Sequence, residues 1–179
     1  MTIVSFINII LSLGVIASQV FIIVAIIYFL FFRKKQHAAV TFLGQHGILL
    51  AFLVSLAATL SSLFYSQIAG FAPCDLCWFQ RIFMYPEVIL LGIALVKKDS
   101  KIIDYAVSLS VVGFLVSLYH NYIYYYNGGL NVFCQLGGTQ VSCIKRYVFE
   151  FGYITIPLMA LTGFALILIF LMFAKQHKK

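Results

Sequence analysis

The stretch Phe71-Ala-Pro-Cys-Asp-Leu-Cys-Trp-Phe-Gln-Arg81 decides how the chain is organised, because it places two cysteines where a polar loop enters an apolar helix. Pro73 presets the backbone for a helix start, so Cys74 is expected near the first turn, where unpaired N–H groups and the helix dipole stabilise a thiolate. Cys74, Cys77 and Arg81 then follow i, i+3, i+7 spacing and line one helix face. The pattern indicates a candidate redox site.

A C-x-x-C pair alone is a weak signal, because redox motifs, zinc sites and haem attachment sites all use it. No histidine follows Cys77, which argues against covalent haem attachment. A structural disulfide, a pair of metal ligands and two incidental thiols remain open on the motif alone. The rest of the chain has to distinguish among them.

The composition indicates whether water or membrane lipid surrounds the protein. The chain is 63% hydrophobic and 9% charged, with a mean hydropathy of +1.04, which excludes a water-soluble domain. A membrane-spanning helix needs about 20 apolar residues, so the chain has room for about four to six spans and little else. We therefore expect an integral membrane protein that folds as one helical bundle.

Five apolar runs are long enough to span a bilayer. They are Thr2 to Phe32, about Gly44 to Ile68, the cysteine stretch to Val96, Ile102 to about Tyr124, and Phe151 to Ala174. A secretory signal peptide would carry positive charge before its apolar run and a small-residue cleavage site after it. Neither feature is visible around the first run, so we expect an uncleaved first span.

The basic residues predict the orientation, since Lys and Arg favour the cytoplasmic side of short loops. Nine of the twelve fall in three clusters, Arg33 to Lys35, Lys97 to Lys101, and Lys175 to Lys179. Five alternating spans place these clusters on one face, so the C terminus is expected in the cytoplasm and the N terminus outside. The net charge of +7 then serves orientation and attraction to anionic membrane lipid. No segment is long enough to form a nucleic-acid-binding surface.

The same topology places all four cysteines outside, with Cys134 and Cys143 in the polar loop 127–150. An even count on an oxidising face favours disulfides, and two separate pairs suggest a relay of disulfide exchange. Structural disulfides explain the loop pair better than the C-x-x-C pair, whose short ring gains little entropic stabilisation. Zinc held by four thiolates also stays open, although the eight residues between Cys134 and Cys143 depart from the usual knuckle spacing.

These residues resemble the DsbB/BdbC family of membrane thiol-disulfide oxidoreductases, and in particular its BdbC-like branch. The resemblance covers about Gly44 to Ala174 and rests on Pro73-Cys-Asp-Leu-Cys-Trp-Phe-Gln-Arg-Ile-Phe-Met-Tyr-Pro86, the basic turn after the next span, Tyr119-His120, the two-cysteine loop and Gly152-Tyr-Ile-Thr-Ile-Pro157. It implies an all-α, polytopic membrane four-helix bundle at 38–179. Residues 1–35 add a fifth, N-terminal span, whereas family members usually have four spans with both ends inside.

The resemblance also implies an activity in the bacterial cytoplasmic (inner) membrane. The protein would reoxidise an extracytoplasmic DsbA-like thioredoxin-fold oxidase and pass the electrons to a membrane quinone, ubiquinone or menaquinone, in support of disulfide bond formation. Cys134 or Cys143, with Cys134 preferred, would form the mixed disulfide with the partner. The released thiol would attack the Cys74–Cys77 disulfide, and the reduced pair would deliver electrons to quinone, with Cys77 nearest the ring.

Three polar side chains are candidates to bind the quinone. Arg81, one turn deeper than Cys77, would hold a positive charge beside a thiolate and beside the oxygen that becomes anionic on reduction. Gln80 and His120 are candidates to hydrogen-bond the ring, and His120 also to supply a proton. Snorkelling of Arg81 to the membrane interface and interfacial placement of Gln80 are the structural alternatives. No metal site is expected.

Two other functions remain open. A vitamin-K-epoxide-reductase-like enzyme also couples thiols to quinone, but it would be expected to carry its C-x-x-C after the loop pair, the reverse of the order here. A non-enzymatic membrane protein would use its disulfides only to staple its loops. Glu87, beside Pro86 near the middle of the third span, is expected either to be neutral or to face a polar cavity, with polar packing near a Pro-induced kink.

Overall fold

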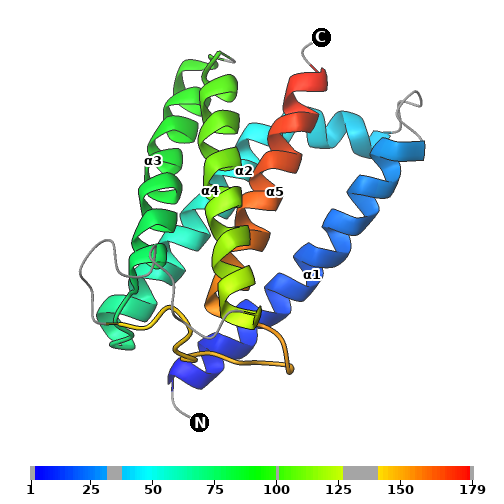
Figure 1. The fold of residues 1–179 in the computed structure, drawn as a ribbon. Coiled ribbons are helices and arrows are strands. Elements are labelled where there is room, and N and C mark those ends of the chain that lie inside the picture. Colours follow the sequence, from blue (N-terminus) through cyan, green and yellow to red (C-terminus); the bar gives the residue numbers. More distant parts are fainter. Residues whose placement is uncertain (1–2, 32–37, 100, 127–140, 178–179) are drawn as a thin grey trace.

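The computed structural model is helical and describes residues 3–31, 38–99, 101–126 and 141–177 (Figure 1). The helices are α1 (Ile3–Phe31), α2 (Ala38–Leu63), α3 (Asp75–Lys97), α4 (Ile102–Tyr126) and α5 (Ile156–His177). A short π-helical turn, η1 (Phe64–Ile68), continues α2. Within these described ranges, five segments are long and apolar enough to cross a membrane, which confirms the predicted all-α, five-span architecture.

The start of the last helix differs from the prediction. The sequence predicts a fifth span from Phe151, whereas α5 begins at Ile156. Phe151 and Gly152 adopt φ values of +52° and +78°, so the backbone leaves the helical region there. The turn is closed by two backbone hydrogen bonds between Glu150 and Ile154, of 2.9 and 3.0 Å. Apolar composition alone did not reveal this turn.

Four helices form a closed ring around the core. α2 packs against α3 and α5, and α4 packs against the same two helices. Buried side chains from three of them meet in the centre, including Leu91 of α3, Ile103 of α4, and Phe164, Ile167 and Leu171 of α5. α1 lies outside the ring, against α5.

The cysteine-bearing segments and the C terminus lie at opposite ends of the bundle. The N terminus, the start of α3 and the segment 141–155 lie at one end, and the C terminus lies at the other (Figure 1). Near the C-terminal end, the Lys175 ammonium donates to the Asp104 carboxylate at 2.6 Å, linking α5 to the first turn of α4. Cys74, Cys77 and Cys143 are therefore at the end opposite the basic C terminus.

Glu87 is fully buried between α3 and α4. Its Oε1 accepts a hydrogen bond from the Ser110 hydroxyl, and its Oε2 has no hydrogen-bond partner within the described residues. Ser110 therefore supplies the polar packing expected for Glu87 beside Pro86.

A close approach between α4 and α5 depends on Gly113. A Cβ added there would collide with the fully buried Phe164 ring. Gly113→Ala should therefore lower the unfolding free energy by about 1–3 kcal/mol through overpacking, measured by denaturation in detergent. Gly92→Ala is the matched control, because its Cβ would lie at an ordinary 3.5 Å from Phe52, and it should be neutral or stabilising. Equal losses in both variants would contradict this packing.

Candidate functional site

The loop before α3 is fixed by aromatic stacking and by a reversal at Gly70, whose φ is +70°. Phe71 donates its backbone N–H to the Tyr65 carbonyl at 2.9 Å, and its ring stacks on the Tyr65 and Tyr147 rings at centroid distances of 5.6 and 4.7 Å. Because Tyr147 belongs to the segment after Cys143, this stacking joins the two cysteine-bearing segments.

Cys74 is the N-cap residue of α3. Its backbone is extended, with φ −78° and ψ 172°, and its Sγ accepts a hydrogen bond from the Cys77 backbone N–H at 3.4 Å. A sulfur in this position meets the unpaired N–H groups of the first helical turn, as expected from Pro73 just before it. The helix start therefore provides the anion-stabilising environment that the sequence predicts for Cys74.

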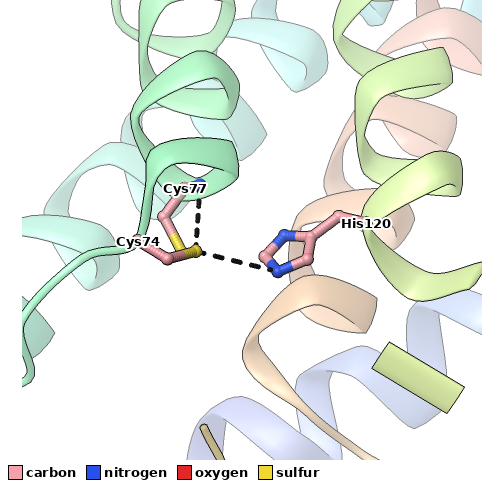
Figure 2. Close-up of side chains that lie close together, drawn as sticks. All are labelled: Cys74, Cys77 and His120. Atoms are coloured by element: carbon pink, nitrogen blue, oxygen red, sulfur yellow. Dashed lines mark hydrogen bonds between the residues drawn. The ribbon is translucent and has the colours of Figure 1, made fainter. Parts of the chain in front are cut away.

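The two cysteines of the motif are free thiols whose sulfur atoms lie 2.7 Å apart. His120 of α4 points at them, with its Nε2 3.8 Å from Cys74 Sγ (Figure 2). The same Nε2 lies 3.2 Å from the Cys143 carbonyl oxygen, which can only accept a hydrogen bond. Nε2 therefore carries the proton, and His120 connects the Cys74–Cys77 thiol pair to the second cysteine segment.

Cys74 is the thiolate of the pair. The hydrogen bond from the Cys77 thiol, followed by that from His120, lowers the pKa of Cys74 to about 5 against the opposing effect of burial. At neutral pH the sulfur is therefore ionised. Stabilising the thiolate of a reduced pair makes the corresponding disulfide more oxidising.

Cys143 lies beside this pair and is disulfide-bonded. It is 3% exposed and belongs to a buried cluster with Cys74, Leu76 and Ile123. Cys134 lies outside the described residues. A disulfide sulfur is not a thiolate ligand, so this state is incompatible with the zinc site of four thiolates that the sequence left open.

Cys74, Cys77 and His120 could in principle form a zinc site with three protein ligands. The donor atoms of Cys74, Cys77 and His120 all lie within 4.8 Å of one another. Tetrahedral zinc, with Zn–S bonds of about 2.3 Å, would hold two sulfurs about 3.8 Å apart. The observed separation of 2.7 Å is shorter than this, so the two sulfurs are too close together for both to bind one zinc ion in this geometry.

Arg81 is held one turn below Cys77 by the end of α2. Its Nε donates to Ser62 Oγ at 3.0 Å and a terminal nitrogen donates to the Ser62 carbonyl at 3.2 Å. Its guanidinium also lies 5.1 Å from the centre of the Trp78 ring. The guanidinium is therefore fixed within the protein, in contrast to the snorkelling alternative.

One cavity of about 440 Å³ connects these groups. All predicted site residues that the structure describes line it, namely Cys74, Cys77, Gln80, Arg81, His120 and Cys143. Gln80 is 7% exposed, and its Nε2 has no hydrogen-bond partner in the described part of the chain. The cavity therefore brings together a buried amide donor, a cation and the thiol pair.

Sequence reasoning missed two residues at this cavity, Ser62 and Tyr65. Ser62 accepts from Arg81 and also from the Tyr85 hydroxyl at 3.2 Å, and Tyr65 donates to Asn8 of α1 at 3.0 Å. The available signal was the pair Ser61-Ser62 followed by Tyr65 late in an otherwise apolar span. Polar side chains at that depth need partners, which here come from α1 and α3.

The lowered pKa of Cys74 predicts a specific titration. The ultraviolet absorbance of the thiolate in the reduced protein should appear with a midpoint near pH 5, because the pKa of Cys74 is about 5. His120→Ala should raise that midpoint, since it removes a hydrogen bond to the thiolate. Because the folded value lies below the ordinary one, the stabilisation of the reduced protein should be complete at alkaline pH and disappear as pH falls towards 5. A Cys74→Ser control that keeps the low transition would contradict the assignment.

Comparison with known proteins identifies the family. The family described as "Disulfide bond formation protein DsbB" matches residues 44–174, which include all four cysteines. "Disulfide bond formation protein C" of Bacillus subtilis (strain 168) is 39% identical over 128 residues, 72% of this chain and 91% of its own length. "SPbeta prophage-derived disulfide bond formation protein B" of the same strain is 48% identical over 119 residues, 66% of this chain and 78% of its own.

A third relative, "Probable disulfide formation protein C 1" of Bacillus cereus (strain ATCC 10987 / NRS 248), is 43% identical over 122 residues, 67% of this chain and 85% of its own length. No solved structure matches the chain. The family match covers most of the chain and confirms the resemblance seen in the sequence. This chain, a multi-pass membrane protein of disulfide bond formation, belongs to the DsbB/BdbC family.

Proposed function

We propose that the protein is a thiol-disulfide oxidoreductase that reoxidises an extracytoplasmic DsbA-like, thioredoxin-fold oxidase and passes the electrons to a membrane quinone. One observation carries the proposal. The Cys74–Cys77 pair and the disulfide-bonded Cys143 meet at a cavity that also holds Arg81 and Gln80. A structural staple would need neither a second, reduced pair beside it nor a cavity with a cation.

The thiol steps conserve electrons. The partner's dithiol loses two electrons and two protons and becomes a disulfide, while the loop disulfide of Cys143 opens to two thiols. We assign the mixed disulfide with the partner to Cys134. The loop thiols then close again by reducing the Cys74–Cys77 disulfide, which leaves the pair in the reduced state that the structure describes.

The cavity residues fit a quinone, whose ring carries two oxygens that accept hydrogen bonds. Gln80 Nε2 is a buried donor without a partner among the described residues, and the Arg81 guanidinium lines the same space. A bound quinone would supply the chemistry of accepting two electrons and two protons. Ubiquinone and menaquinone both meet this description.

The residues around the pair have separate roles in the proposal. Cys74, ionised at neutral pH, supplies the reactive sulfur, and Cys77, 2.7 Å away, closes the new disulfide. Cys77 is proposed to lie nearest the ring. His120 moves a proton at its Nε2 and orients the Cys74 thiolate. Arg81 stabilises negative charge that develops on the acceptor.

The orientation is part of the same proposal. The cysteine-bearing end and the N terminus face outside the bacterial cytoplasmic membrane, and the basic C terminus faces the cytoplasm. Residues 38–179 form the family's bundle with its two external cysteine loops, and 1–35 form the added helix. Labelling of cysteines from either side of sealed vesicles tests this, and labelling of the two pairs from opposite sides would contradict it.

The activity is tested with the purified full-length protein, a reduced thioredoxin-fold oxidase and a short-chain quinone. Quinone reduction stoichiometric with partner oxidation is expected. A protein whose disulfides only staple its loops would leave both substrates unchanged, and that result would overturn the proposal. A matched reaction without the partner controls for direct reduction of the quinone.

A further inference from the structure

We propose that α1, the helix outside the family match, forms a wall of the cavity and contacts the isoprenoid tail of the quinone. This inference rests on the proposed function, because it assigns a tail-binding surface to the same site. Within the family match, residues 44–174, no part of α1 is included. The added helix is therefore assigned a role in choosing the lipid-soluble substrate.

The C-terminal half of α1 packs directly on the bundle. Ala25 is buried, and the rings of Phe21 and Phe29 contact the Phe170 and Phe173 rings of α5 at centroid distances of 5.4 and 4.7 Å. Aromatic contacts at these distances leave no room for a ligand between the helices. This half anchors α1 to α5.

The part of α1 before Phe21 is held differently. The Asn8 Oδ1 accepts a hydrogen bond from the Tyr65 hydroxyl at 3.0 Å, in a buried contact, and the Gln19 Oε1 accepts one from the Tyr153 hydroxyl at 2.9 Å. These two polar contacts come from α2–η1 and from the segment before α5. They fix α1 against the bundle at two points without the close ring packing seen from Phe21 onward.

Between these two points, α1 faces the cavity. Leu11, Gly14, Val15 and Ser18 recur at helical spacing and all line it. A Cβ added to Gly14 would meet nothing within 4 Å, so the cavity continues up to the α1 backbone there. Adjacent Leu13 is 53% exposed and is not among the lining residues; it lies about 100° around the helix from Gly14, which is itself exposed where the cavity opens.

The chemistry of the lining indicates which occupant fits. Cys77, Gln80 and Arg81 supply polar groups to one region, whereas Val54, Ala58 and Leu166 contribute apolar side chains to the same cavity. Where the wall is apolar it offers water no hydrogen bonds, so that part of the cavity favours an apolar group. A molecule with a redox-active polar ring and an apolar tail satisfies both parts, and a prenylated quinone has that form.

Gly14→Leu tests the inference, because the new side chain would enter open space and compete with the tail. We expect about a tenfold rise in the KM for a prenylated quinone, through lost apolar contact, with turnover of a tail-less quinone unchanged. Binding is measured independently by quenching of the fluorescence of Trp78, the only tryptophan. The centre of its ring lies 5.1 Å from Cζ of Arg81, which lines the cavity. The prenylated quinone should quench at correspondingly higher concentration in this variant.

Leu13→Phe is the matched control, since it adds bulk on the neighbouring, exposed side of α1. It should leave both quinones unaffected. If Gly14→Leu behaves like this control, or slows both quinones and thiol exchange alike, the wall assignment is overturned while wild-type turnover still supports the proposed function. If the wild type reduces neither quinone, the proposed function itself fails.

Discussion

Cys74→Ser should abolish quinone reduction completely, although the variant should fold and keep the Cys143 disulfide. The physical reason is that Cys74 is the ionised sulfur of the pair, with a pKa of about 5, whereas a serine hydroxyl is neither ionised nor able to form a disulfide. The measurement is quinone reduction in the presence of the reduced thioredoxin-fold oxidase. Retained turnover would show that Cys74 does not take part in electron transfer.

Cys77→Ser is the matched control, because it removes the other sulfur and leaves the Cys74 nucleophile. Cys74 should then attack the neighbouring loop disulfide and remain joined to a loop cysteine, since the sulfur 2.7 Å away that would resolve the adduct is missing. Mass spectrometry of the non-reduced protein detects this link. An adduct between Cys74 and the soluble partner instead, in a Cys134→Ser background, would reverse the assigned order of the relay.

The sequence predicted the parts of the site that depend on local chemistry. Pro73 and the apolar run after it predicted a helix start at the C-x-x-C motif, and Cys74 is indeed the N-cap residue of α3. Hydropathy predicted five spans because long apolar runs enter lipid. Each such run has to be helical there, since unpaired backbone groups are costly in lipid. Both features depend only on neighbours in the chain.

Contacts across the bundle were harder to predict. His120 lies 46 positions from Cys74, and only the packing of α4 against α3 aims its Nε2 at the sulfur. The link from Arg81 to Ser62 and the turn at Phe151 likewise depend on tertiary structure or on a left-handed backbone conformation. Apolar periodicity carries little information about such contacts, because lipid and protein core both favour the same residues.

Arg81→Leu should lower kcat for quinone reduction by about 100-fold or more, the usual cost of removing one group that stabilises developing negative charge. Thiol exchange with the soluble partner should remain nearly intact, because the guanidinium hydrogen-bonds to Ser62 of α2 and not to Cys143. Stopped-flow measurement of the two half-reactions, partner oxidation and quinone reduction, separates these effects in the same preparation.

Arg81→Lys separates the effect of charge from that of hydrogen bonding. Lysine keeps the charge but cannot reproduce the two hydrogen bonds from the planar guanidinium to Ser62. An intermediate rate of quinone reduction is expected, because the ammonium group is mobile where the guanidinium is held in place. Ser62→Ala should shift the rate in the same direction by a smaller factor, because Arg81 keeps its bond to the Ser62 carbonyl. If Arg81→Leu slows both half-reactions equally, the residue holds α3 to α2 and has no electrostatic role in electron transfer.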